Sequence, residues 1–165
     1  MIRKATSEDL TYIMAIVKRV VTVMNRQGSY QWDDSYPQVK DYQKDIDRGE
    51  LYVFETNSTL VGVCTISNRG HEEYHLIAWT PHHKFFTLKR LAIDPSARGK
   101  GIADQFFTYA EQLALKNNVT LINTDTFSEN HYAQQLFKRN GYQFVQTRKE
   151  NEHAPKLAYF EKIIE

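Results

Sequence analysis

Residues 88–107, "LKRLAIDPSARGKGIADQFF", place an apolar run, a glycine-rich basic turn and an amphipathic run in immediate succession. The turn packs two cations and two glycines into positions 98–101. This order predicts a strand that ends at Asp94-Pro95 and a helix that begins near Gly101. A strand joined to a helix in this way needs neighbouring strands and covering helices, so we expect a mixed α/β sheet flanked by helices.

The rest of the chain carries patterns for both kinds of element. Apolar residues at helical spacing predict a helix over residues 10–24, and Pro37 is placed to open a second helix that stops near Gly49. Strands are expected at 1–6, 51–56, 59–67, 85–93, 119–127, 142–148 and 157–164, and further helices at 101–118 and 128–141, the last capped by Ser128. Residues 68–84 are polar and irregular. The predicted order is β-α-α-β-β-β-α-β-α-β-β in one domain, residues 1–165.

Composition excludes several classes of protein. With 165 residues, 41% of them hydrophobic, the chain is long and apolar enough for a folded core. A net charge of +1 gives no basic surface for nucleic acid. We expect no signal peptide and no membrane span, because no apolar run approaches the ~20 residues that a span requires. The single cysteine, Cys64, indicates a reducing cytoplasm and lies in an apolar run, where core packing is its expected role.

The basic turn has the chemistry of a pyrophosphate site. A helix N-terminus presents backbone N–H groups and a positive dipole end, glycine lets a ligand approach them, and Arg98 and Lys100 add charge. The Walker sequence is absent, and Asp104 stands where a dinucleotide fingerprint needs glycine or alanine. The alternative is a glycine-rich turn whose cations are solvated.

Two segments resemble the acetyl-CoA motifs of the GNAT superfamily of N-acetyltransferases. "RGKGIA" at 98–103 is similar to the signature [RQ]-x-x-G-x-[GA]. "NHYAQQLFKRNGYQFV", which begins at Asn130, is similar to the second cofactor segment, N-x-x-A-x-x-[LF]-[YF]-x-x-x-G-[FY]. The order and spacing of the two segments also fit, and the loop "GSYQWDDSYPQVKDYQKDI" resembles that of a group of bacterial members. The resemblance covers essentially the whole chain.

The resemblance implies a fold and a cofactor site. The fold is a mostly antiparallel sheet in which strands 88–93 and 120–125 are parallel central neighbours that splay apart. The expected cofactor is acetyl-CoA, with no metal. The pyrophosphate would lie on Arg98, Gly99, Lys100, Gly101, Ile102 and Ala103, the pantetheine arm along the backbone of Leu91, Ala92 and Ile93, and further contacts would come from Asn130 and Phe137.

Transfer to an amine calls for a base and is helped by an acid. Asp125 is the candidate base, because some relatives have a glutamate base at this spacing before the asparagine; the alternative is that its carboxylate accepts backbone N–H bonds. Glu72 and Glu73 are further candidates for the base. The superfamily commonly has tyrosine where this chain has Phe137, so Tyr132 or Tyr142 is the candidate acid.

The resemblance also implies that the first interhelical loop helps to form the acceptor site. Tyr30, Trp32 and Tyr36 lie beside Asp33 and Asp34, and aromatics with carboxylates suit a cationic amine. The alternative is that these rings pack the loop onto the sheet. The six histidines show no metal-binding pattern.

We therefore expect a cytoplasmic enzyme that transfers an acetyl group from acetyl-CoA to an amino group. The acceptor is either a small molecule or a protein amino group, and the sequence does not decide between them. A non-catalytic acyl-CoA-binding module is the alternative. Homodimers are common in the superfamily, but this sequence does not reveal the oligomeric state.

Overall fold

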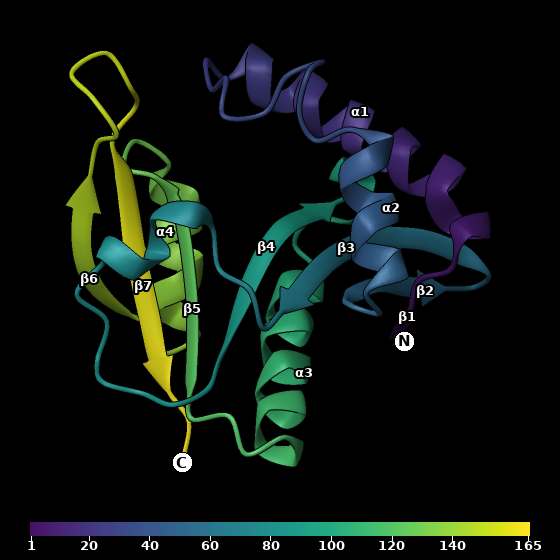
Figure 1. Cartoon of the computed structure of the whole chain (residues 1–165). Helices are drawn as coiled ribbons and strands as arrows, with labels where there is room; N and C mark the ends of the chain where they lie inside the picture. The colour runs from purple at the N-terminus through teal and green to yellow at the C-terminus, as the bar shows by residue number, and fades with distance from the viewer. The chain divides into compact units, whose positions relative to one another are not determined.

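The computed structural model describes all residues, 1–165, and contains the helices and strands in the expected order (Figure 1). The strands are β1 (Ile2–Lys4), β2 (Leu51–Thr56), β3 (Thr59–Ser67), β4 (Phe85–Ile93), β5 (Leu121–Phe127), β6 (Gln143–Arg148) and β7 (Leu157–Ile163). The helices are α1 (Leu10–Arg26), α2 (Val39–Asp47), α3 (Ile102–Lys116) and α4 (His131–Arg139), with short 3₁₀ turns η1 (Ser7–Asp9), η2 (Glu72–Leu76) and η3 (Pro95–Ala97).

The strands form one mixed sheet in the order β1-β2-β3-β4-β5-β7-β6. Its parallel pair is β4 with β5, in a short register of Phe85–Thr87 against Leu121–Asn123. β5 pairs antiparallel with β7 along its whole length, and β6 pairs antiparallel with β7. The expected mostly antiparallel sheet with a central parallel pair and flanking helices is confirmed.

The chain divides into two compact units, the first made of residues 1–66 and 90–106 and the second of residues 67–89 and 107–165. In the first unit α1 buries one apolar stripe, as its helical spacing predicts. That stripe forms a hydrophobic core with residues of β2, β3 and α2. The fully buried residues of this core include Ile13, Tyr42, Val53 and Val63. Cys64 is also fully buried, and burial raises the pKa of its thiol, which confirms a packing role.

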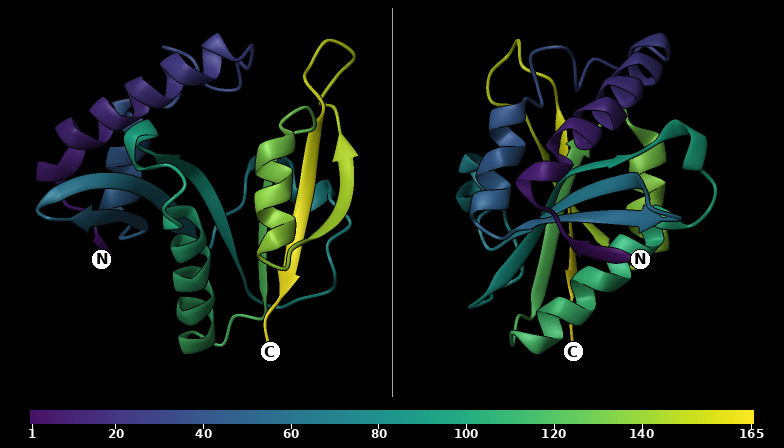
Figure 2. Two further views of the ribbon diagram at one scale, coloured as in Figure 1. Left: turned by 180° about the vertical axis from the view of Figure 1, so that it is seen from behind. Right: turned by 90° about the vertical axis from the view of Figure 1, so that its right-hand side faces the viewer.

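In the second unit α4 and η2 lie on opposite faces of the strands β5, β7 and β6 (Figures 1 and 2). Side chains alternate between the two faces along a strand. Tyr159 therefore packs with Tyr74 of η2, whereas its neighbour Phe160 packs against Phe137 of α4.

Two local expectations were wrong. Residues 68–84, expected to be irregular, contain η2, whose Tyr74 is buried. Ser128 does not cap α4, because the helix begins at His131 and the side chain of Asn130 accepts the Ala133 N–H at 3.0 Å. Among the helices, none is both long enough and apolar enough to cross a membrane.

Candidate functional site

The basic turn between β4 and α3 presents an open backbone. Gly99 and Gly101 have φ angles of +77° and +74°, a backbone conformation that residues with a Cβ rarely adopt. A Cβ built at either glycine would meet nothing within 4 Å. Arg98 and Lys100 are exposed on either side of Gly99, and α3 starts at Ile102. The turn is therefore a cationic helix N-terminus whose backbone a ligand can approach.

Asp94 holds the turn in place. Its carboxylate accepts hydrogen bonds from the N–H and the hydroxyl of Ser96, and Arg19 of α1 pairs with it at 2.6 Å. The Asp94 N–H donates to the carbonyl of Val61 on β3 at 2.8 Å. Burial raises the pKa of the Asp94 carboxyl, but the Arg19 pair and the Ser96 bonds lower it more. Asp94 thus joins the turn to α1 through its carboxylate and to β3 through its backbone N–H.

The end of β4 is held by a buried ion pair that the sequence analysis did not single out. Arg90 has a φ of +52°, which is unusual for a residue with a long side chain. Its guanidinium donates two hydrogen bonds to the carboxylate of Asp45, on α2, from Nε at 2.8 Å and from Nη2 at 2.7 Å. Thr65 donates to the same carboxylate at 2.6 Å, and the Tyr42 hydroxyl donates to the Arg90 carbonyl at 3.3 Å. Leu91, Ala92 and Ile93, predicted to lie along the pantetheine arm, follow this anchor directly.

The three predicted acceptor-site aromatics have different surroundings. Tyr30 is 67% exposed, whereas Trp32 is 8% exposed and belongs to the core cluster with α1. Tyr36 is half-buried, and its hydroxyl accepts a hydrogen bond from Arg90 Nη1 at 3.2 Å. Trp32 thus packs the loop onto the core, Tyr36 joins it to the buried ion pair, and Tyr30 is the ring most available to a ligand.

Asp125 lies in a polar cluster on the η2 face of the second unit. Tyr159 is its cross-strand partner on β7, so the two side chains share a face. Tyr74 donates its hydroxyl hydrogen to Asp125 Oδ1 at 2.5 Å, and Tyr159 donates to Glu73 at 2.9 Å. The Asp125 side chain is only 13% exposed. The carboxylate is therefore held by a side chain, not by the backbone N–H groups that the alternative reading required.

Burial decides the protonation of this cluster. It raises the pKa of Asp125 to about 6, although the Tyr74 hydrogen bond acts in the opposite direction. Burial and then the Glu73 hydrogen bond raise the pKa of Tyr159, and burial raises that of Tyr74. Both phenols therefore remain donors near neutral pH, while Asp125 can exchange a proton there.

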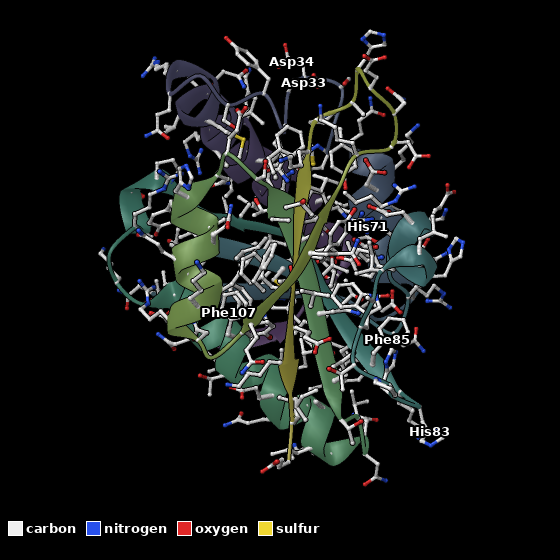
Figure 3. All side chains as sticks on the ribbon, turned by 90° about the vertical axis from the view of Figure 1, so that its left-hand side faces the viewer. Asp33, Asp34, His71, His83, Phe85 and Phe107 are labelled. Atoms are coloured by element: carbon white, nitrogen blue, oxygen red, sulfur yellow. The ribbon has the colours of Figure 1, made fainter.

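His71 lies beside the same carboxylate. Its Nε2 is 3.9 Å from Asp125 Oδ1, and its ring contacts Tyr74 edge-on with the centroids 5.4 Å apart. The residue immediately precedes η2 and lies next to it in Figure 3. The structure brings no three histidine, cysteine or carboxylate side chains into a metal-binding group.

A cavity of about 370 Å³ opens near this cluster in the second unit. It is lined by Glu72, Glu73, His75, Leu76, Arg148, Glu150, Ala154, Pro155 and Leu157. Three carboxylates against one guanidinium, that of Arg148, give the cavity a negative character. Arg148 pairs with Glu150 at 2.6 Å, so the surplus negative charge of the cavity comes from Glu72 and Glu73.

The candidate acids Tyr132 and Tyr142 and the predicted cofactor contact Phe137 lie in contrasting environments. Tyr132 is 66% exposed on α4, whereas Tyr142 is buried against Phe107. Phe137 is also buried, edge-on to Phe107 and Phe160 at centroid distances of 6.0 and 5.3 Å. Phe137 is thus part of an aromatic core around α4.

Because that core is apolar, Phe137→Tyr should lower the free energy of unfolding by about 1–3 kcal/mol, the cost of burying an unpaired hydroxyl. The matched control is Phe144→Tyr, because Phe144 also packs on Phe160 but is 53% exposed. Chemical denaturation of both variants measures the difference. Equal stability of Phe137→Tyr and wild type would mean that the new hydroxyl finds a partner.

Sequence reasoning did not single out Asp45, His71, Tyr74 or Arg90, which belong to these clusters. Asp45 offered one signal, since it lies three positions after Tyr42 and therefore on the inward face of α2. The other three gave no signal, because each takes its role from a partner far away in the sequence.

The chain is similar to known proteins in its sequence pattern and in its fold. A family model described as the acetyltransferase (GNAT) family matches residues 17–142. No curated protein matches the chain.

Many solved structures share the fold. A GNAT-family acetyltransferase of Streptococcus agalactiae is 24% identical over 100% of this chain and 95% of its own, with a TM-score of 0.84. The ribosomal-protein-alanine N-acetyltransferase of Brucella melitensis is 19% identical over 99% of both chains, with a TM-score of 0.73. The yncA protein of Salmonella typhimurium, whose structure includes its cofactor acetyl-CoA, is 15% identical over 100% of this chain and 94% of its own, with a TM-score of 0.70. At such identities the likeness concerns the fold.

Proposed function

Since the chain belongs to the acetyltransferase (GNAT) family, we propose that it transfers an acetyl group from acetyl-CoA to an amino group. The observation that carries the proposal is the open turn at Gly99 and Gly101, in the segment that resembles the family's cofactor signature. Its glycines, its two cations and the start of α3 fit a pyrophosphate. Acetyl-CoA, when bound, supplies an acetyl group activated as a thioester.

In this proposal the residues of the first unit hold the cofactor. Arg98 to Ala103 bind the pyrophosphate, and the backbone of Leu91, Ala92 and Ile93 binds the pantetheine arm as an added strand would. The buried pair of Arg90 and Asp45 keeps the end of β4 fixed for this purpose.

Asp125 acts as the base in this proposal. An ammonium group with a pKa of about 10.4 must lose a proton before it can attack, and a carboxylate of raised pKa is better matched to take that proton than an ordinary one. The negative cavity beside η2 favours an acceptor that arrives as an ammonium ion. Tyr74 keeps the Asp125 carboxylate in one orientation.

The test is thioester consumption with acetyl-CoA and a panel of primary amines and peptides with free N-termini. Transfer to any of them supports an N-acetyltransferase. Binding of coenzyme A without transfer across the whole panel would favour a non-catalytic acyl-CoA-binding module.

We expect Arg98→Ala to weaken coenzyme A binding by about tenfold to a hundredfold, the loss of one charge-assisted hydrogen bond of 1–3 kcal/mol. Gly101→Val should weaken it more, because the new side chain covers the open backbone. Gly28→Val is the control, since Gly28 also has a positive φ, +85°, and open space around it. Calorimetric titration gives the dissociation constants. Wild-type affinity in both Arg98→Ala and Gly101→Val would refute the pyrophosphate assignment.

A further inference from the structure

A proton that reaches Asp125 needs a way out. The inference rests on the proposed function, in which Asp125 takes a proton from the acceptor in every turnover. Its side chain is 13% exposed, and its Oδ1 is occupied by the hydroxyl of Tyr74. Tyr74 offers no direct route to solvent, because it is itself only 5% exposed.

His71 is placed between Asp125 and solvent. Its Nε2 lies 3.9 Å from Asp125 Oδ1, while its side chain is 34% exposed. That distance is longer than a hydrogen bond, but catalytic hydrogen bonds are often long before a substrate binds and tighten afterwards. Imidazole is the side chain whose ordinary titration lies closest to neutral pH, so it can both accept and release a proton there.

We propose that His71 relays the proton from Asp125 to solvent, as a residue that acts through Asp125 and does not itself touch the acceptor. The acceptor N–H bond breaks as an O–H bond forms on Asp125. That O–H bond then breaks as an N–H bond forms on His71 Nε2, which gives an imidazolium ion. The imidazolium loses its proton to water or buffer, so both residues return to their starting states without any oxidant or reductant.

The surrounding charges favour this direction of transfer. From η2 the Glu73 carboxylate faces the cluster, together with the Tyr74 hydroxyl. From β7 the Tyr159 hydroxyl binds Glu73, and from β6 Arg148 supplies the neighbouring positive charge. The Asp125 carboxylate that remains after the transfer stabilises the imidazolium form of His71.

The first test needs no acceptor. NMR titration of the histidine ring protons, with His71 assigned by its loss in His71→Ala, should show that Asp125→Asn moves the His71 midpoint to lower pH by about one pH unit, because a neighbouring negative charge is lost. His82 is the internal control because, like His71, it is half-buried and packs edge-on against an aromatic ring. Its partner is Phe85, with the ring centroids 5.5 Å apart. An unchanged His71 midpoint in Asp125→Asn would overturn the proposal.

The second test uses an amine that the wild type acetylates. His71→Ala should lower kcat by about 10- to 100-fold at low buffer concentration, with little change in the KM of acetyl-CoA. Added imidazole should restore much of the loss, which a purely structural role for His71 would not allow. His82→Ala should behave as wild type. A wild-type kcat in His71→Ala at low buffer would refute the relay.

The two tests distinguish a failure of the relay from a failure of the proposed N-acetyltransferase function on which it rests. If the His71 midpoint responds to Asp125→Asn while no amine is acetylated, the coupled pair stands and the N-acetyltransferase proposal fails. If amines are acetylated but the midpoint stays fixed, the N-acetyltransferase proposal stands and the relay fails.

Discussion

Replacing Asp45 with alanine should lower the free energy of unfolding by about 3–5 kcal/mol. Asp45 is fully buried, and its carboxylate is the partner of the Arg90 guanidinium, whose side chain is only 12% exposed. The substitution would leave a buried positive charge without its counter-ion and remove the acceptor of the Thr65 hydroxyl. Denaturant unfolding monitored by circular dichroism measures the change.

The control for Asp45→Ala is Asp47→Ala on the same helix, because Asp47 is exposed and binds Gln43. That variant should stay within about 0.5 kcal/mol of wild type. The double variant Asp45→Ala with Arg90→Met should recover part of the loss, since it removes the stranded charge. If Asp45→Ala were as stable as Asp47→Ala, the ion pair would not hold the end of β4.

Local patterns in the sequence predicted most of the fold. The strand, turn and helix around residues 88–107 appear as β4, η3 and α3, and the hairpin at Asn57 and Ser58 joins β2 to β3. These elements depend on apolar periodicity and on glycine and proline at turns, which are properties of neighbouring residues. The same reason explains why the open turn at Gly99 and Gly101 was found in advance.

The polar clusters could not be predicted in the same way. Asp45 and Arg90 are 45 positions apart, and Tyr74 and Asp125 are 51 positions apart. Nothing in either sequence neighbourhood indicates the partner, because contacts of this kind depend on strand register and on which face of the sheet an element covers. The same dependence on distant partners explains why η2 was not predicted. Its burial depends on the packing of Tyr74 with Tyr159 and Trp79, which the short, polar sequence of η2 does not reveal.

Asp125→Asn should lower kcat by about 10²- to 10⁴-fold while leaving the affinity for coenzyme A unchanged. Asparagine keeps the shape of the side chain and can still accept the Tyr74 hydrogen bond, but it cannot take a proton at neutral pH. In the wild type, kcat/KM should rise with pH as Asp125 ionises, with a midpoint at about 6. The variant should lose this limb of the profile. Glu129→Gln is the control, since Glu129 is exposed and follows β5 closely.

Stability separates a catalytic Asp125 from one that only holds the structure together. Its pKa is raised from 3.8 to about 6 on folding, so between these values the folded state binds more protons than the unfolded chain. The unfolding free energy therefore falls as pH rises through this window, and above pH 6 the buried charge costs stability. Asp125→Asn removes that charge, so at pH 8 the variant should be more stable than wild type by about 1–3 kcal/mol although its turnover is lost. A variant that is less stable and fully active would instead assign Asp125 to the structure and leave Glu72 and Glu73 as candidates for the base.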